Sequence, residues 1–223
     1  MQIIYRGGRL GIFQGRKFIF LEILLCVVLG VGIVCYTQSN QEITQKQHTA
    51  LYYVNISGKQ RFLAQRIVFL SQIISTNFIL KRNNQETLLE LRHCINELSS
   101  FHQILQNFVV STIVGSEEYF TLNDVYFGSG GLMLKMEKFL DNVNQIFYLT
   151  NFNDILQINQ SLLQQLEGDN GLLMSLELAT LSQQIYGQTF LREQERNTEW
   201  FLYFGVFICV LQAILLLWNV ARR

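Results

Sequence analysis

The sequence predicts an all-α protein in which a helical bundle is anchored in a membrane by two transmembrane helices. Three observations support this fold class. The chain of 223 residues is 49% hydrophobic and contains no proline, so long uninterrupted helices are permitted. Two strongly apolar runs lie near its ends, and apolar residues recur at helical spacing between them.

The two apolar runs each have the length of a membrane span. The first, residues 18–36, holds one charge, Glu22, in about nineteen residues, which nearly crosses a hydrocarbon core of about 30 Å. The second, residues 200–219, has Trp200 at one end and Trp218 near the other, where aromatic rings favour the membrane interface. A cleaved signal peptide is the alternative for the first run. That run is longer than a signal core, and no small-x-small cleavage site follows it, so we expect an anchor.

Charge is segregated along the chain. Residues 1–17 carry Arg6, Arg9, Arg16 and Lys17 without an acid, and residues 220–223 end in two arginines. Because basic residues favour the cytoplasmic side, we expect both termini in the cytoplasm and residues 37–199 outside it. Membrane lipid is then an expected partner. The formal net charge of zero and the absence of a basic patch argue against nucleic acid.

The segment 37–199 is predicted to be helical throughout most of its length. A first helix is expected to end near Leu80, before the polar cluster 81–84, and a second to begin near Gln85. An aromatic-rich connection then leads to a third helix over 132–147. Another helical segment covers 151–166, and a turn at 168–171 precedes a last helix that continues into the second apolar run. Because an amphipathic helix must bury its apolar stripe, we expect an up-down four-helix bundle.

No chemistry-bearing motif stands out. The three histidines, His48, His93 and His102, lack metal-ligand spacing and read as surface or partly buried helix residues. Cys94 is the one cysteine outside the apolar runs, so no internal disulfide is expected. The glycines at 128–131 lack the order of a phosphate loop, and Glu117, Glu118 and Asp124 do not match a calcium loop. We therefore expect no enzyme site, no metal and no cofactor.

The segment 55–71 is the most informative part of the chain. On a helix, one apolar stripe faces the bundle core, namely Ile56, Leu63, Ile67, Leu70 and Ile74. A second stripe on roughly the opposite side contains Leu51, Val54, Gly58, Arg61, Gln65 and Val68. Gly58 would permit close approach of a second copy of this helix, which places two Arg61 side chains near a shared axis. A small anion would then remove their repulsion and bind both guanidinium groups. The alternative is that Arg61, Lys59 and Arg66 lie on a solvated face or pair with acids of neighbouring helices.

The run from Ile56 to Ile67, ISGKQRFLAQRI, resembles the opening motif of the sensor domain in PilJ-type methyl-accepting chemotaxis transducers of type IV pilus systems. It is more distantly similar to the signature of nitrate and nitrite sensor kinases, and residues 159–166 match a weaker pattern of the PilJ-type family. The resemblance implies a periplasmic sensor in the bacterial inner membrane that works as a homodimer. Gly58 and Arg61 match the positions that hold the anion in the nitrate sensors. The motif departs from the commoner pattern at Phe62 and Ala64, where methionine and serine are usual.

The function expected from this resemblance is transmembrane signal transduction. Members of the family continue after the second span into an output module, whereas this sequence ends at Arg223. We expect either a sensor that acts through a separate membrane or cytoplasmic signalling partner, or a piece of a longer receptor. The alternative function is a membrane-anchored scaffold that docks a protein partner without a small-molecule ligand.

Overall fold

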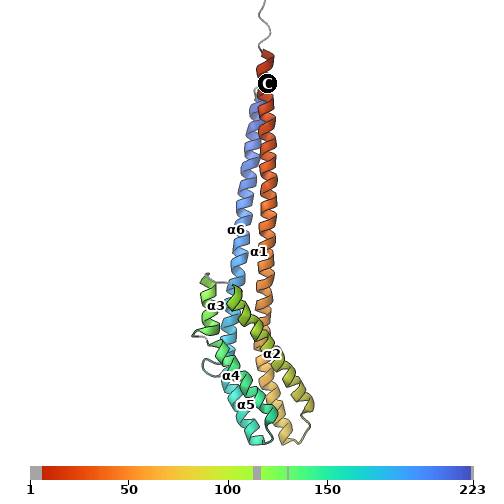
Figure 1. Cartoon of the computed structure of the whole chain (residues 1–223), viewed down its shortest axis with the longest axis vertical. Coiled ribbons are helices and arrows are strands. Elements are labelled where there is room, and N and C mark those ends of the chain that lie inside the picture. The colour runs from red at the N-terminus through yellow and green to blue at the C-terminus, as the bar shows by residue number, and fades with distance from the viewer. Residues whose placement is uncertain (1–6, 113–116, 130, 222–223) are drawn as a thin grey trace, which may run out of the picture. The chain divides into compact units, whose positions relative to one another are not determined.

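The computed structural model describes residues 7–112, 117–129 and 131–221, and every regular element among them is a helix (Figure 1). The predicted all-α class is confirmed. The chain divides into two compact units, which are described separately. Unit 1 comprises Met1–Gln47 with Thr189–Arg223, and unit 2 comprises His48–Gln188.

Unit 1 is a pair of antiparallel helical segments. They are the first part of α1 (Gly7–Ile79) and the last part of α6 (Leu172–Ala221). Tyr36 stacks on Phe201 with 4.2 Å between ring centroids. The Gln47 amide donates to Gln194 at 2.7 Å, and that of Gln212 contacts the Cys26 sulfur at 3.8 Å. Residue numbers therefore rise along one segment as they fall along the other.

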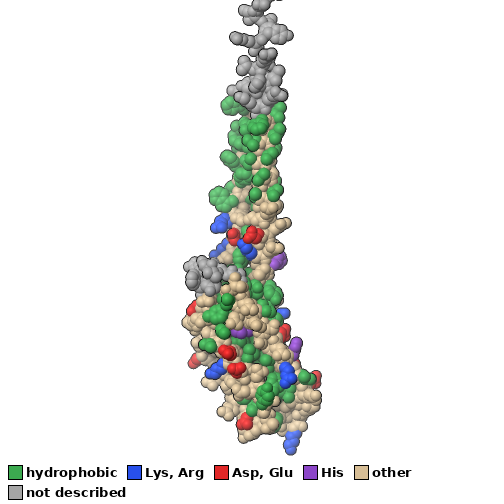
Figure 2. All heavy atoms as spheres, viewed as in Figure 1, with side chains coloured by type: hydrophobic (Ala, Val, Ile, Leu, Met, Phe, Trp, Pro, Cys, Tyr) green, Lys and Arg blue, Asp and Glu red, His purple; other side chains and the backbone are tan. Residues whose placement is uncertain are grey.

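The apolar side chains of unit 1 point mostly outward. By length and composition, α1 and α6 each hold a stretch that can cross a membrane, and only 6% of each stretch is buried. Figure 2 shows hydrophobic side chains over this part of unit 1. The core helix of a soluble protein would bury such residues, so this distribution fits contact with lipid. The predicted orientation depends on the basic side chains at 6, 9, 16, 17, 222 and 223, and these are not among the side chains that the structure describes.

Unit 2 contains the remaining helices. They are the second part of α1, α2 (Gln85–Thr112), α3 (Glu117–Phe127), α4 (Leu132–Gln145), the 3-10 turn η1 (Ile146–Tyr148), α5 (Phe152–Glu167) and the first part of α6. The predicted breaks at 81–84 and 168–171 are confirmed. A possible break was predicted at 151–153, but the structure has it at 149–151, because α5 begins at Phe152. The prediction of an irregular connection before Leu132 was wrong in part, because α3 occupies it. Flanking glycines suggested a loop, but Leu122, Val125 and Tyr126 of α3 are buried in the core.

α1 packs against three helices in unit 2. Its Tyr53 stacks on Phe108 of α2 at 3.8 Å between centroids. The main-chain oxygen of Ser71 accepts a hydrogen bond from Asn159 of α5 at 3.0 Å. Ser57 bonds Thr180 of α6 at 2.9 Å. α5 and α6 thus follow one another along α1, with α5 beside the later residues and α6 beside the earlier ones.

α4 and η1 contact three other helices of unit 2. Lys135 of α4 donates to Ser175 of α6 at 2.7 Å, and Asn142 donates to Ser161 of α5 at 3.3 Å. Arg92 of α2 lies over the Phe147 ring of η1 at 4.8 Å. Along the chain, α1 is followed by α2, then by α3 and α4, and then by α5 and α6 (Figure 1).

The turn between α5 and α6 depends on glycine. A Cβ on Gly168 would lie 2.4 Å from the Gln164 oxygen, and one on Gly171 would lie 2.6 Å from the Leu166 oxygen. Both atoms belong to the backbone, which cannot move away easily. Glycine at these two positions therefore lets α6 begin directly where α5 ends.

Two leucines of α4 provide a test of the core. Leu132 is fully buried, whereas Leu134 is 71% exposed. Leu132→Ala should lower the free energy of unfolding by about 2–5 kcal/mol, because it removes buried methyl groups and leaves a cavity. Leu134→Ala should change it by less than about 0.5 kcal/mol. Thermal unfolding of the full chain in detergent, followed by circular dichroism, measures both. Equal effects at the two positions would contradict the described packing of α4.

Candidate functional site

The segment 55–71 lies within α1 in unit 2, and its predicted core stripe is confirmed. Ile56, Leu63, Ile67, Leu70 and Ile74 are all buried. Their spacing brings them to one side of the helix, where α2, α5 and α6 cover them. This packing fixes which side chains of the segment face outward.

The second predicted stripe is displaced from the one that the structure exposes. Val68 was expected on it, but Val68 is buried in the core, so that prediction was wrong. Three neighbouring helices pack on α1, so the buried sector of α1 is wider than the single apolar stripe that the sequence predicted. The exposed strip, called here the outward face of α1, is Leu51, Asn55, Gly58, Phe62, Gln65 and Phe69.

Gly58 lies in the middle of this outward face. A Cβ built on it would meet no atom within 4 Å, so nothing inside the chain requires a glycine there. A glycine in a helix interior costs about 0.5–1 kcal/mol relative to alanine. The packing of a single chain therefore does not explain this residue.

Arg61 lies at the edge of the outward face. Its side chain is 44% exposed, and its Nη1 atom is 3.9 Å from an oxygen of Glu177 on α6, itself 63% exposed. An exposed ion pair of this kind contributes at most about 1 kcal/mol. The alternative in which Arg61 pairs with an acid of a neighbouring helix is thus present in the structure, and its guanidinium remains accessible.

The other two cations of the motif are engaged elsewhere. Arg66 donates from Nε to Glu90 of α2 at 3.1 Å, and its Nη2 atom contacts the same carboxylate. The Lys59 ammonium lies over the Phe101 ring of α2, 5.5 Å from the centroid. Both side chains therefore fasten α1 to α2. Of the three cations, Arg61 is the one whose described contact is a long ion pair, at 3.9 Å.

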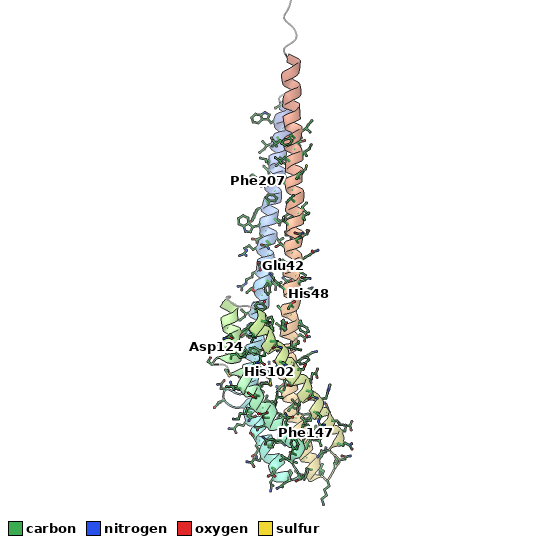
Figure 3. All side chains as sticks on the ribbon, in the orientation of Figure 1. Glu42, His48, His102, Asp124, Phe147 and Phe207 are labelled. Carbon is green, nitrogen blue, oxygen red and sulfur yellow. The ribbon has the colours of Figure 1, made fainter. Side chains whose placement is uncertain are left out.

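A polar layer inside unit 2 escaped the sequence analysis. It consists of Ser57 and Gln60 on α1, His102 on α2, Tyr126 on α3 and Gln183 on α6, all buried. Gln183 donates to the Tyr126 hydroxyl at 3.2 Å, and the rings of His102 and Tyr126 stack with centroids 6.4 Å apart. Figure 3 labels His102 among the helices of unit 2. The sequence did contain a signal for the burial of Gln60. Together with Ile56, Leu63 and Ile67, it forms the 4-3-4 spacing of a buried helix face.

Burial controls the ionisation of this layer. It lowers the pKa of His102 to about 4, because the charged imidazolium loses its hydration. It also raises the pKa of Tyr126, so the hydroxyl stays protonated. The layer is therefore uncharged at neutral pH.

The remaining candidates for chemistry have ordinary structural roles. Asp124 accepts hydrogen bonds from the Ser129 amide at 3.1 Å and hydroxyl at 2.8 Å, which lower the pKa of its carboxyl. The side chains of Glu117 and Glu118, weighed with Asp124 as a calcium loop, lie outside the described ones. All four cysteines are free, and burial raises the pKa of the Cys94 thiol. No group of three potential metal ligands occurs among the described residues.

Two surface hollows lie away from the motif's predicted ligand residues. One of about 300 Å³ lies between α1 and α5, where Ser75, Phe152 and Asn159 line it. Another of about 310 Å³ is lined by Arg92, Asn96 and Asn144, among others. Neither includes Gly58 or Arg61, so a ligand at those residues would require a second surface to enclose it.

Comparison with protein-family models, curated proteins and solved structures found no match to the chain.

The depressed pKa of His102 predicts a pH-dependent stability. In the unfolded chain the imidazole takes up a proton near pH 6.5, whereas in the fold it does so only near pH 4. Stability from this group is therefore complete above about pH 6.5 and is lost as the pH falls toward 4, by about 3 kcal/mol in total. Unfolding of the wild type and of His102→Gln between pH 4 and 7.5 measures it. A stability difference between the two proteins that does not change with pH would contradict this prediction, because it would mean that His102 is solvated in the fold.

Proposed function

We propose that this chain is a membrane-anchored sensor. In this proposal, residues 37–199 form an up-down four-helix bundle outside the cytoplasm, between transmembrane helices at 18–36 and 200–219. The membrane is the bacterial inner membrane, with both termini in the cytoplasm. Two copies pair through the outward face of α1. The observation that carries the proposal is this face, an exposed apolar strip centred on an unexplained glycine.

The outward face has the composition of a contact surface. Phe62 is 61% exposed and Phe69 is 53% exposed, although both are large and apolar. The neighbouring α6 adds exposed apolar side chains at 4-3-4 spacing, namely Met174, Leu178, Leu181 and Ile185. Covering such a surface is favourable by roughly 25 cal/mol per Å² of apolar area. A second copy, held in the same membrane, is the most readily available cover.

A two-fold axis through this face supplies the ligand site. Gly58 permits close approach of two α1 helices, and each copy brings one Arg61 beside the axis. Among the described residues, the ion pair of Arg61 is the weak contact to Glu177, at 3.9 Å. A small oxyanion would accept guanidinium donors from both copies, and such charge-assisted bonds are stronger than an exposed ion pair.

Ligand binding would be relayed along the helices. α1 and α6 each hold residues of unit 2 and an apolar stretch of unit 1 within one unbroken helix. A ligand that binds one arrangement of the two copies more tightly than another shifts the population between them. The resulting displacement would act on a cytoplasmic or membrane signalling partner.

A constant scaffold is the second candidate. The contact of Arg61 with Glu177 favours it, because a paired arginine has less need of an anion. In that case the apolar outward face binds a partner or a second copy without any ligand.

An anion titration distinguishes the two candidates. The full chain in detergent should melt at a higher temperature in sodium nitrate or acetate than in sodium chloride of equal ionic strength, because binding to the native state stabilises it. Stabilisation reaches about 2.7 kcal/mol at a hundredfold excess over Kd. Arg61→Ala should remove the effect, and the exposed Arg82→Ala should retain it. An identical response in both variants, or none with any anion, would favour the scaffold.

A further inference from the structure

The hollow between α1 and α5 lies within unit 2 and has the size of a small-molecule site. Its volume is about 300 Å³, at the lower end of the range for ligand pockets. Its lining comes from α1, between Gln72 and Ile79, and from α5, between Phe152 and Leu163. Among the described residues that line the hollow, none carries a charge. The hollow therefore has no group that would balance a charged ligand.

Most of the hollow is apolar. Ile79, Leu156 and Leu163 line it and are all exposed, although they are large apolar side chains. Leu156 and Leu163 are seven residues apart, which places them on the same side of α5. Phe152 lines the hollow as well and stacks on Phe78 of α1, with 6.5 Å between ring centroids. An apolar molecule that covered these side chains would remove them from water, which is favourable.

Asn159 gives the hollow one fixed polar group. Its amide nitrogen donates to the main-chain oxygen of Ser71 at 3.0 Å and also contacts the hydroxyl of Ser75. A main-chain oxygen can only accept, so a flip of the amide would set two acceptors against each other. The Ser71 contact therefore fixes which atom of the amide is nitrogen and which is oxygen.

The oxygen of this amide is left without a donor. Asn159 is 7% exposed, and its Oδ1 atom is buried with no hydrogen-bond partner among the described residues. The two hydroxyl groups that line the hollow donate within α1. Thr76 donates to the Gln72 oxygen at 3.0 Å, and Ser75 donates to the Ser71 oxygen at 3.4 Å. Because a buried acceptor without a partner is destabilising, a donor brought by a ligand would stabilise this site.

We propose that the hollow between α1 and α5 binds a small neutral molecule with an apolar body and one N–H or O–H donor. The body contacts Ile79, Leu156 and Leu163, and the donor pairs with the Asn159 oxygen. The site contains neither Gly58 nor Arg61. It is therefore separate from the proposed anion site, and failure of the anion titration would leave it unaffected.

The hollow also adjoins the outward face of α1. Gln72, Thr76 and Ile79 line the hollow, are exposed, and continue the 4-3 spacing of Phe62, Gln65 and Phe69 along α1. In the pairing proposed above, a bound molecule would thus lie beside the contact between two copies. This consequence rests on the proposed function, whereas the binding site itself does not.

Two probes that differ in one chemical group test the site. Benzamide has an apolar ring and an N–H donor, and N,N-dimethylbenzamide keeps the ring and the carbonyl group but has no N–H. Benzamide should raise the melting temperature of the full chain in detergent saturably, by about 3–6 °C at ten times its Kd. The dimethyl compound should bind about tenfold more weakly or worse, because it leaves the Asn159 oxygen unpaired. Equal affinity for the two probes, or no saturable response to benzamide, would overturn the proposal.

A matched pair of variants locates the response. Leu156→Trp places a larger side chain in the hollow and should abolish the effect of benzamide. Leu134→Trp makes the same change at an exposed position of α4 that does not line the hollow, and it should leave the effect unchanged. The same response in both variants would contradict the assignment of the site.

A measurement on the wild type keeps the test decisive if Leu156→Trp does not fold. In the isotope-labelled full chain in micelles, benzamide should shift the methyl signals of Leu156 and Leu163 and the side-chain amide signals of Asn159. The methyl signals of Leu134 should not move, which controls for partition of benzamide into the micelle. Shifts that are absent at all three lining residues, or equal at Leu134, would overturn the site.

Discussion

The burial of one side of α1 is the interaction on which the rest of unit 2 depends. Its apolar stripe, from Ile56 to Ile74, is covered by α2, α5 and α6, and each of these runs antiparallel to it. With three neighbours packed on it, α1 keeps only a narrow strip outside. The outward face is thus a consequence of core packing, and so is the accessibility of Gly58 and Arg61 at that face.

The same stripe also contains the feature that packing alone does not explain. Gln60 occupies a core position between Ile56 and Leu63. On the helices around it, His102, Tyr126 and Gln183 are also buried, and Tyr126 contacts the other two. Burial keeps this layer uncharged, as the depressed pKa of His102 indicates. A neutral, buried layer and an accessible arginine outside it divide the chemistry of α1 between two sides of one helix.

The sequence predicted the helical class and most helix ends, because these depend on local signals such as the polar cluster before Gln85 and the glycines at 168 and 171. α3 was missed, since eleven residues between glycines carry little periodicity and their burial depends on distant helices. Val68 was placed on the wrong face because the width of the buried sector depends on how many helices pack on α1. The polar layer was missed because polar residues in an apolar stripe read as solvent-facing until their neighbours are known. Gly58 and Arg61 were predicted as ligand residues from the motif, and both their role and the ligand stay predictions.

The proposed sensor depends on whether two copies meet at the outward face of α1. The most direct test is disulfide cross-linking of the full chain in membranes, with the four native cysteines replaced by alanine and a single new cysteine added. Gln65→Cys lies on that face, whereas Leu134→Cys is exposed on α4. A disulfide requires Cα atoms within about 7 Å, so pairing through α1 predicts a covalent dimer from position 65 and none from position 134. No dimer at 65, or equal dimer at both positions, would contradict the account.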